Sequence, residues 1–537
     1  MRSDEPTYRR TSVLLALAIL LAACGGTDRV AREEPEAVAR APEPVAALPA
    51  IPEADGSLGI DLAYPRPGAV RPQADSTFLF GTVGTGRATL RINGTRVPVA
   101  PNGSFLAFLP VADVYRMQAQ AGGRTDTTRF RYGQTVTPKD ARPLSAPRLA
   151  TVISGRDTLD EASQIVAGRE TPGGNRRFFF PRGARLRVDA RLPGALRVRL
   201  GDTTTAWVDA AAVRVGERVD TTSTSTVGSV RTVSAPDYID VRIPAGFAPF
   251  DVTAEADAVG ITVFDRRAAE EQVSVGGDAF LRAGRWTQSG PDCSRLLLLL
   301  NRPLWGYKAF YEPNGTLVVR LRRPPRLPAR AAAADTATAP LRGLRVLVDP
   351  GHPPGGAIGP SGLSEAEANL AIARRVAERL REKGAAVRMT RTTEAPLENA
   401  TWAPDELWAR VDLAVRSGAH LLVSIHNNAF PDGTNPFANV GSEVYYFHPF
   451  AQDLARGMSE EISETTGLRN KGAKRRSLAL VRPTWMPAVL TESLYLMFPQ
   501  QEAALRDPAF LDRLAGAHVR GIERFLDVRL DSGSEDP

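Results

Sequence analysis

The sequence predicts a multidomain protein in which N-terminal all-β modules precede a C-terminal α/β domain with an open, largely parallel twisted sheet. Two observations predict this fold class. In the first half of the 537 residues, short apolar alternations are separated by Asn-Gly and other Gly-rich turns, which are typical of β-hairpins. From Leu344 onward, apolar strands alternate with amphipathic helices, a pattern typical of a parallel sheet covered on both faces.

The composition excludes several classes of protein. Hydrophobic residues make up 43% of the chain and charged residues 24%, values typical of packed globular domains. A wholly disordered chain, a collagen and a polytopic membrane protein are therefore excluded. The net charge of +7 is mild for 537 residues. It suits an anionic polymer but does not argue for nucleic acid, so we expect no nucleic-acid partner.

Residues 1–23 have the features of a secretory signal peptide. Arginines precede the apolar run Val13–Ala23, which is shorter than the about twenty residues of a bilayer span. The run ends in Leu-Ala-Ala-Cys24-Gly25, which resembles the lipobox of bacterial lipoproteins. The resemblance implies cleavage before Cys24, lipidation of Cys24 and sorting to an outer membrane. An ordinary cleaved signal with a chance cysteine is the alternative.

The next 300 residues are predicted to form a tether, three β modules and a linker. Residues 24–57 are rich in Ala, Pro and Glu, which indicates a disordered tether. Residues 58–135 are predicted to form an immunoglobulin-like β-sandwich. Residues 145–217 resemble a bacterial SH3-like domain, although one β domain continuous with its neighbours is the alternative. Residues 219–323 are predicted to form a β-sandwich that resembles an AMIN domain, and the Pro- and Ala-rich residues 324–341 a linker.

The C-terminal domain is predicted over residues 342–530. Apolar residues at three- and four-residue spacing, such as Leu370, Ala373 and Val376, indicate a helix that Gly384 ends. The same reasoning predicts helices at 366–382, 405–416, 450–465 and 507–527, and strands at 344–348, 387–390, 421–425, 444–447, 479–481 and 488–491.

Polar residues follow three of these strands. His352, His426 and Glu492 come after predicted strands, and Glu365 begins the first helix. Ligands of parallel sheets bind beyond the carboxyl ends of the strands. We therefore expect two imidazoles and two carboxylates at one rim of the sheet.

Two histidines and one glutamate are the ligand set of many catalytic zinc sites. A further carboxylate beside them is suited to proton transfer in hydrolysis. A lone histidine at a strand end is more often a hydrogen-bonded loop residue, but the four residues together are hard to explain in that way. The chain has five histidines, and we interpret the other three, His420, His448 and His518, as structural.

Two neighbouring carboxylates could serve as the acidic ligand. Ser364 and Glu367 form the Ser-x-x-Glu pattern of a capping box, in which Glu367 turns back to the amide of Ser364. Glu365 stands at the first position of the helix, where the helix dipole favours an ionised carboxylate. We therefore predict that Glu365 is the ligand.

Four segments, 348–352, 362–370, 424–429 and 486–492, match a known family in order and spacing. Through them, residues 344–527 resemble the zinc-dependent N-acetylmuramoyl-L-alanine amidases known as amidase type 3. The resemblance implies that Zn²⁺ is the cofactor, that His352, Glu365 and His426 are its ligands, and that Glu492 is the catalytic carboxylate. The segment after Glu492 departs from the family pattern, with Leu-Tyr and Met-Phe where the family commonly has Gly-Phe and Ser-Asn.

The resemblance implies a peptidoglycan hydrolase that cleaves the amide between N-acetylmuramic acid and L-alanine of the stem peptide. With Cys24, it implies a lipid-anchored enzyme of the cell envelope, at the outer membrane facing the periplasm. The β modules would bind peptidoglycan or cell-division and envelope proteins. The alternatives are a non-catalytic peptidoglycan-binding scaffold and another zinc amidohydrolase or peptidase of the cell wall.

Overall fold

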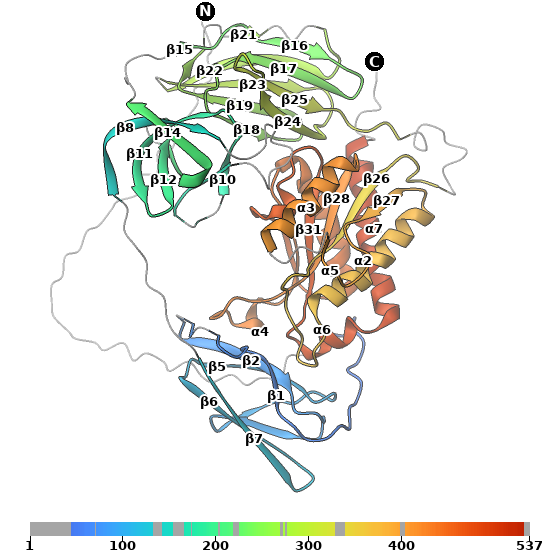
Figure 1. The fold of residues 1–537 in the computed structure, drawn as a ribbon. Coiled ribbons are helices and arrows are strands. Elements are labelled where there is room, and N and C mark those ends of the chain that lie inside the picture. The colour runs from blue at the N-terminus through green and yellow to red at the C-terminus, as the bar shows by residue number, and fades with distance from the viewer. Residues whose placement is uncertain are drawn as a thin grey trace, which may run out of the picture. The chain divides into compact units, whose positions relative to one another are not determined.

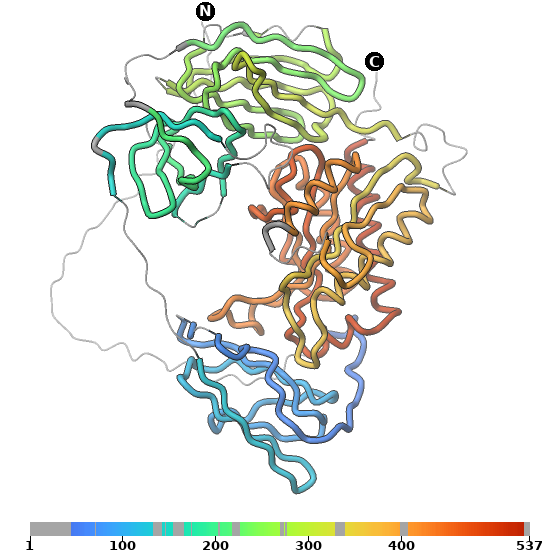
Figure 2. Tube along the Cα trace, viewed as in Figure 1, coloured from blue at the N-terminus to red at the C-terminus, as the bar shows by residue number. Residues whose placement is uncertain are grey.

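We describe a computed structural model of the chain, whose elements are labelled in Figure 1 and whose path is traced in Figure 2. The structure describes residues 45–530, except residues 70, 73, 133–141, 154–165, 173, 175, 202–203, 219–224, 269–271, 274–276, 291, 328–338 and 398–402. The predicted signal peptide, the lipidation site Cys24, the first part of the tether and most of the linker lie outside the described residues.

The predicted tether differs from the structure over its last part. Leu48 is 5% exposed and belongs to a hydrophobic core. The side chain of Gln500 accepts a hydrogen bond from Val45 N at 2.8 Å and donates one to Val45 O at 3.0 Å. The composition of residues 24–57 is that of a disordered segment, but a few apolar side chains within it, such as Val45 and Leu48, find partners in the folded domains.

The first β module is a sandwich of two sheets, with strand orders β1-β2-β5 and β4-β3-β6-β7. Leu79, Leu90 and Phe105 are fully buried and belong to one core that both sheets line. The Asn93-Gly94 turn has φ values of +47° and +83°, as a type I′ hairpin turn requires. The predicted sandwich is present, and its immunoglobulin-like character stays a prediction. The strands are β1 (Asp61–Tyr64), β2 (Ser76–Thr82), β3 (Thr89–Ile92), β4 (Thr95–Val97), β5 (Ser104–Pro110), β6 (Val114–Ala121) and β7 (Arg124–Arg131).

The second module is one seven-stranded sheet with its own core. The strand order is β10-β9-β13-β12-β11-β8-β14, and its likeness to SH3 domains stays a prediction. The elements are β8 (Arg142–Val152), β9 (Val166–Arg169), β10 (Arg176–Phe180), β11 (Arg185–Leu192), β12 (Ala195–Arg199), β13 (Thr205–Asp209), η1 (Ala210–Ala212) and β14 (Val213–Arg218).

The third module is again a sandwich, with strand orders β16-β17-β25-β24 and β18-β19-β23-β22-β21, beside a two-stranded pair β15-β20. Its likeness to AMIN domains stays a prediction. The strands are β15 (Ser225–Thr226), β16 (Arg231–Ser234), β17 (Tyr238–Pro244), β18 (Phe250–Ala254), β19 (Ala258–Phe264), β20 (Arg266–Arg267), β21 (Gln272–Val273), β22 (Leu281–Gly290), β23 (Cys293–Leu300), β24 (Gly306–Tyr311) and β25 (Thr316–Arg322).

The C-terminal domain contains a six-stranded sheet of order β27-β26-β28-β31-β29-β30. Only the β29–β31 pair is antiparallel, so the predicted open, largely parallel sheet is confirmed. The strands are β26 (Arg345–Pro350), β27 (Ala386–Met389), β28 (Leu421–Asn428), β29 (Ser442–Tyr446), β30 (Asn470–Arg475) and β31 (Ala488–Tyr495). The helices are α2 (Glu365–Glu382), α3 (Ala403–Arg416), α4 (Pro436–Asn439), η3 (Pro449–Ala451), α5 (Gln452–Thr466), η4 (Ala479–Val481), α6 (Pro499–Ala504) and α7 (Pro508–Leu530).

Helices cover both faces of this sheet. Helices α2, α5 and α7 lie on one face, and α3 lies on the other (Figure 1). Val346 and Val348 face the first group of helices, whereas Leu347 between them packs with Val411 and Ala414 of α3. Because successive strand residues face opposite sides, strands covered on both faces are apolar without alternation. This is why β26 and β28 could be predicted from the apolar runs at residues 346–348 and 421–423.

Two segments of the C-terminal domain differ from the prediction. The predicted strand 479–481 is the 3₁₀ helix η4, in which Val481 N donates to Leu478 O at 3.3 Å. Three apolar residues are too few to distinguish a strand from a buried turn. The edge strand β30 was not predicted, because its sequence Asn-Lys-Gly-Ala-Lys-Arg has no apolar alternation. The short helices α4 and α6 were also not predicted.

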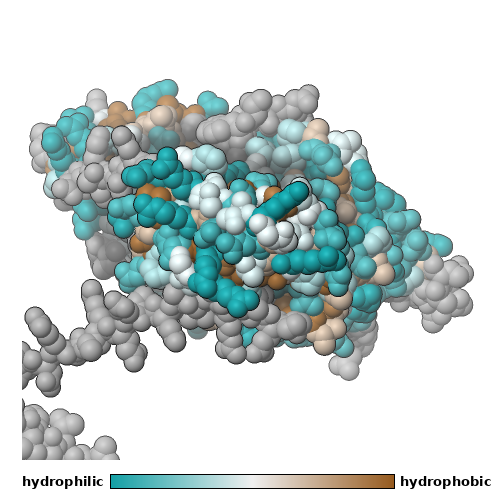
Figure 3. Space-filling view, turned by 90° about the horizontal axis from the view of Figure 1, so that it is seen from below, coloured by the Kyte–Doolittle hydropathy of each residue, from teal (hydrophilic) through white to brown (hydrophobic). Residues whose placement is uncertain are grey.

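The described residues on the face seen in Figure 3 are mainly hydrophilic. On the face seen in Figure 3, hydrophobic residues form small groups among hydrophilic ones. In the part of the chain that the structure describes, the large hydrophobic residues that are exposed are Val215, Val233, Leu407 and Val528. No described helix combines the length and the apolar character that a membrane crossing needs.

Candidate metal centre

Four predicted site residues come from neighbouring elements of the C-terminal sheet. His352 follows β26, His426 lies near the end of β28, and Glu365 is the first residue of α2. Glu492 is the register partner of His426 on the adjacent parallel strand, so the two side chains share a face of the sheet. Glu492 was predicted to follow its strand. Strand β31 continues to Tyr495, so Glu492 instead lies within the strand.

Three of these residues converge on one point. Nε2 of His352 lies 3.2 Å from Oε2 of Glu365, and Nδ1 of His426 lies 3.0 Å from Oε1 of the same carboxylate. The two imidazole centroids are 5.0 Å apart. One ligand atom from each of His352, Glu365 and His426 can be chosen so that all lie within 4.8 Å of one another. Two nitrogen donors and one carboxylate oxygen at this spacing fit a zinc ion.

The tautomer of His352 agrees with this use. Nδ1 of His352 lies 3.2 Å from the carbonyl oxygen of Pro354. A carbonyl only accepts, so Nδ1 carries the hydrogen, and the lone pair is left on Nε2, which faces Glu365. Gly351 packs against the His426 ring, because a Cβ at Gly351 would stand 2.2 Å from Nε2 and Cε1. Only glycine fits at this position.

Glu365 is buried, 5% exposed, and held from several sides. Its Oε2 accepts a hydrogen bond from Ala357 N at 2.8 Å, and its Oε1 one from Asn369 Nδ2 at 3.3 Å. Burial opposes ionisation of Glu365, but the two imidazoles beside it, which in their protonated form donate hydrogen bonds to its oxygens, outweigh burial and hold the pKa of Glu365 well below its usual range. Glu365 is therefore a carboxylate fixed toward the two imidazoles.

A buried arginine that the sequence analysis missed supports the His352 loop. Arg410 of α3 donates to the carbonyl oxygens of Pro350, His352 and Pro353 at 2.7, 3.0 and 2.9 Å. It also pairs with Asp349 at 2.8 Å, and both side chains are at most 2% exposed. The C-terminal end of β26 and the loop after it are therefore held by one guanidinium.

Glu502 does the same for the loop before α2. This fully buried carboxylate accepts hydrogen bonds from Ser361 N at 2.9 Å and from Leu363 N at 3.1 Å. Neither Arg410 nor Glu502 stands in a recognisable motif. Their roles depend on contacts between distant parts of the chain, and no local sequence signal could have identified them.

Glu492 is a buried carboxylate with an unpaired oxygen. Its Oε2 has no hydrogen-bond partner among the described residues. Burial raises the pKa of Glu492 well above its usual range, and the charges of Glu365 and Glu443 raise it further, while Lys471 opposes them. A carboxylate with a raised pKa can both accept and return a proton near neutral pH.

The other candidates lie away from this centre. His420, His448 and His518 are buried, and their hydrogen bonds involve Arg345 N, Arg482 O, and Leu514 O with Thr491, respectively. The predicted N-cap is confirmed, since Ser364 Oγ accepts from Glu367 N at 3.2 Å. The Glu367 side chain is exposed and forms no described hydrogen bond, so the second half of the capping box is not formed.

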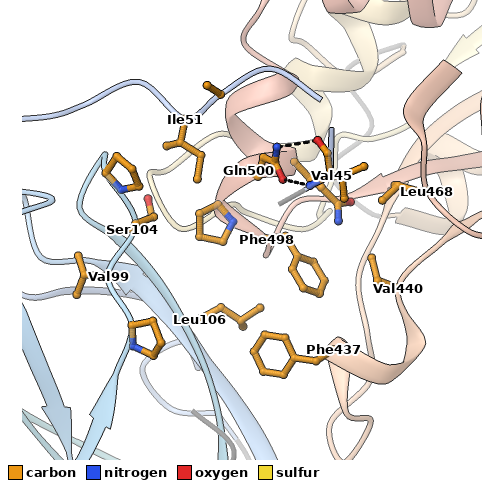
Figure 4. A pocket seen from close by; sticks show the side chains of 16 residues that line it. Val45, Ile51, Val99, Ser104, Leu106, Phe437, Val440, Leu468, Phe498 and Gln500 are labelled. Carbon is orange, nitrogen blue, oxygen red and sulfur yellow. Dashed lines mark hydrogen bonds between the residues drawn. The ribbon is translucent and has the colours of Figure 1, made fainter. Parts of the chain in front are cut away.

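An apolar cavity lies away from the candidate metal centre. It has a volume of 770 Å³ and is lined mainly by apolar side chains, among them Leu106, Phe437 and Phe498 (Figure 4). Figure 4 also shows the paired hydrogen bonds between Gln500 and Val45. The lining includes no titratable side chain, so this cavity offers no groups for acid–base chemistry.

Comparison with known proteins finds relatives of the C-terminal domain. The family described as N-acetylmuramoyl-L-alanine amidase matches residues 346–524. The chain is 30% identical over 203 residues to the germination-specific N-acetylmuramoyl-L-alanine amidase of Bacillus subtilis, with 36% of this chain and 84% of that protein covered. It is 31% identical to the amidase LytC of the same organism, over 33% of this chain and 34% of LytC.

Solved structures give matches over the same part of the chain. The N-acetylmuramoyl-L-alanine amidase of Clostridium difficile 630 is 30% identical, with a TM-score of 0.30, over 34% of this chain and 97% of that one. The catalytic domain of CwlV from Bacillus (Paenibacillus) polymyxa is 33% identical, with a TM-score of 0.31, over 34% of this chain and 99% of that one.

The fold and site define an α/β protein with a His-Glu-His cluster and a neighbouring buried carboxylate. The chain belongs to the N-acetylmuramoyl-L-alanine amidase family.

Proposed function

We propose that this protein is a zinc-dependent peptidoglycan hydrolase that cleaves the amide between N-acetylmuramic acid and L-alanine of the stem peptide. The observation that carries the proposal is the unpaired, buried Oε2 of Glu492, on the strand next to His426 and beside the His352–Glu365–His426 cluster. A cluster of ligands alone could be structural, but a neighbouring unpaired carboxylate with a raised pKa is what hydrolysis requires.

His352, Glu365 and His426 would hold the zinc ion. Zinc bound there supplies a Lewis acid, which polarises the scissile carbonyl and acidifies water. Glu365 contributes the negative charge of the site, and the hydrogen bonds from Ala357 and Asn369 hold its carboxylate in place. The Arg410 and Glu502 contacts fix the two loops that carry His352 and Glu365.

Glu492 would move the proton. Its ionised form accepts a proton from the attacking water, and its protonated form delivers that proton to the leaving nitrogen of L-alanine. Both forms have to be accessible in one catalytic cycle. The raised pKa of Glu492, which comes from burial and from the charges of Glu365 and Glu443, is suited to this double use.

The proposed location rests on the sequence. The lipobox-like residues before Cys24 support a lipid anchor on the outer membrane, facing the periplasm. Part of residues 24–57 would then span from the membrane to the folded domains. The β modules would hold the enzyme near peptidoglycan or near division and envelope proteins.

The test is digestion of purified muropeptides by the full chain, followed by mass analysis of the products. We expect two products, a free stem peptide that begins with L-alanine and the sugar without its peptide, and neither product after zinc is removed by a chelator. Binding without products would instead indicate a peptidoglycan-binding scaffold. Cleavage within the peptide, or removal of acetyl groups, would indicate another amidohydrolase.

A further inference from the structure

Strand β30 places a row of basic side chains at the edge of the catalytic sheet. Lys471 and Lys474 lie in this strand, and Arg476 follows it. The register pairs Glu492 with Glu443, and Tyr445 with Lys474. Register partners and residues two apart point to the same side of a sheet. Glu492, Glu443, Tyr445 and Lys474 therefore share one face, while α5 contacts these strands from the other face.

The positive charge of this row exceeds the negative charge that it meets. The Glu443 carboxylate forms ion pairs with the ammonium groups of both Lys471, at 3.4 Å, and Lys474, so two cations share one carboxylate. The guanidinium of Arg476 lies 5.8 Å from the Tyr445 ring centre. Among the described residues, no ion pair joins Arg476 to a carboxylate. The side chain of Glu443 is 4% exposed and that of Lys474 is 36% exposed, so the surplus positive charge faces solvent.

We infer that Lys474 and Arg476 form a subsite for a carboxylate on the peptide side of the scissile amide. The inference rests on the proposed function. In the uncleaved substrate, the lactyl carboxyl of the sugar is part of the amide, so free carboxylates are found in the stem peptide. Lysine and arginine are the residues that bind carboxylates by charge-assisted hydrogen bonds.

The distance agrees with this assignment. Strand β30 is two strands from β31, which carries Glu492. Neighbouring strands lie about 4.8 Å apart, and successive strand residues about 3.3 Å. Lys474 is level with Leu490, two residues before Glu492, and Arg476 lies two residues further on, so their backbones are about 12 Å and about 16 Å from that of Glu492. Less the reach of the two long side chains, this is the span of about two to four extended residues. The subsite therefore fits a carboxylate on the second or third residue of the stem peptide, and not one at the scissile bond.

Two muropeptides that differ only in this carboxylate, free in one and amidated in the other, test the inference. We expect the wild-type full chain to prefer the free carboxylate in kcat/KM by about tenfold, as one charge-assisted hydrogen bond gives. Arg476→Gln should remove most of this preference and leave cleavage of the amidated substrate within about twofold. Lys474→Met should also remove most of the preference, but it takes a cation from Glu443, whose charge acts on Glu492, so only its ratio between the two substrates is compared. Arg476 forms no described ion pair with Glu443, so Arg476→Gln tests the subsite without changing the ion pairs that Glu443 forms with Lys471 and Lys474. Arg513→Gln, an exposed change on α7, is the control.

Calorimetry of muropeptide binding to the full chain that carries Glu492→Gln separates binding at the subsite from turnover. We expect the free-carboxylate muropeptide to bind about tenfold more tightly than the amidated one, and Arg476→Gln to abolish the difference. Equal losses on both substrates, or no change in either, would overturn the subsite. If the wild type cleaved neither substrate, the proposed function would fail, and the binding ratio would still decide the subsite.

Discussion

At the scale of single residues, Glu492 and the three proposed zinc ligands are expected to have separable roles. A buried polar atom without a partner costs about 1–3 kcal/mol, so the unpaired Oε2 of Glu492 is a cost to the fold that a role in the reaction explains. Glu365, by contrast, has both carboxylate oxygens held by hydrogen bonds, from Ala357 N and from Asn369, and both oxygens face the two imidazoles. The first is expected to act on protons and the second on the metal.

Glu492→Gln should keep zinc and lose activity. The amide has nearly the same shape as the carboxylate but cannot accept a proton. We expect kcat to fall by at least about a hundredfold, the usual contribution of a general base. Zinc content measured by atomic absorption should stay at the wild-type value. Near-normal turnover would contradict the mechanism, and loss of zinc would make Glu492 a ligand.

Glu365→Ala and Glu367→Ala form a matched pair on the first turn of α2. Glu365 is buried against both imidazoles, whereas Glu367 is exposed and offers only its backbone N–H, to Ser364. Glu365→Ala should lose zinc and activity together. Glu367→Ala should keep both and change the free energy of unfolding by less than about 0.5 kcal/mol. Metal analysis and a thermal melt decide between them, and the reverse pattern would reassign the ligand.

At the scale of elements, α3 holds the loop that carries His352 through the side chain of Arg410. Arg410 is 2% exposed and serves Asp349, Glu406 and the carbonyl oxygens of the His352 loop. Arg410→Met would leave the buried carboxylates of Asp349 and Glu406 without the cation that balances their charge. We expect the free energy of unfolding in urea to fall by about 3–5 kcal/mol, and zinc affinity by about 10–100-fold.

The control for Arg410 is Arg374→Met, an exposed arginine on α2 whose side chain bonds a single carbonyl oxygen, that of Thr392. It should change stability by less than about 0.5 kcal/mol. If both variants lost the same stability, the support of the His352 loop by Arg410 would be refuted.

Elements with a strong local pattern could be predicted from the sequence. Helix α2 has Ser364 as its N-cap and buries its predicted apolar stripe, including Ala373 and Val376. Strands β26 and β28 contain the apolar runs 346–348 and 421–423, because helices cover both of their faces. Strand β30 lacks such a pattern, because an edge strand with polar side chains needs no apolar alternation. The run 479–481 was predicted as a strand and is the 3₁₀ helix η4.

The same limit applies to the site. His352, His426 and Glu365 could be predicted because strand ends and a helix start place them by topology, and Glu492 because it ends an apolar run. Arg410, Glu502 and Glu443 could not be predicted. Each lies far in the sequence from its partners, and each is an ordinary charged residue until the fold buries it.

At the scale of the whole molecule, three buried histidines couple the stability of the C-terminal domain to pH. Burial lowers the pKa of His420 to about 3, and those of His448 and His518 to about 4, from 6.5. His518 shows why. The ring is fully buried, its Nδ1 donates to Leu514 O at 2.8 Å, and its Nε2 lies 3.1 Å from the Thr491 hydroxyl. Neither partner carries a negative charge, so nothing there offsets the hydration that a charged ring would lose.

The sign of the effect follows from proton binding. Below pH 6.5 the unfolded chain protonates these histidines and the folded chain does not, so stability is full above pH 6.5 and falls as the pH is lowered toward 4. Between pH 7.5 and 5.5 each histidine should cost about 1.4 kcal/mol. The raised pKa of Glu492 has the opposite sign and offsets part of this sum. We expect the free energy of unfolding of the C-terminal domain to fall by about 2–4 kcal/mol.

His518→Phe isolates one of the three contributions. The variant loses two hydrogen bonds and is less stable at both pH values, so only the difference between pH 7.5 and 5.5 is compared. Urea unfolding with a chelator present keeps metal release out of the comparison. Because phenylalanine binds no proton in either state, the acid-induced loss should be smaller than in the wild type by about 1.4 kcal/mol. An unchanged loss would show that His518 is protonated in the folded domain as readily as in the unfolded chain, against its burial and its two hydrogen bonds.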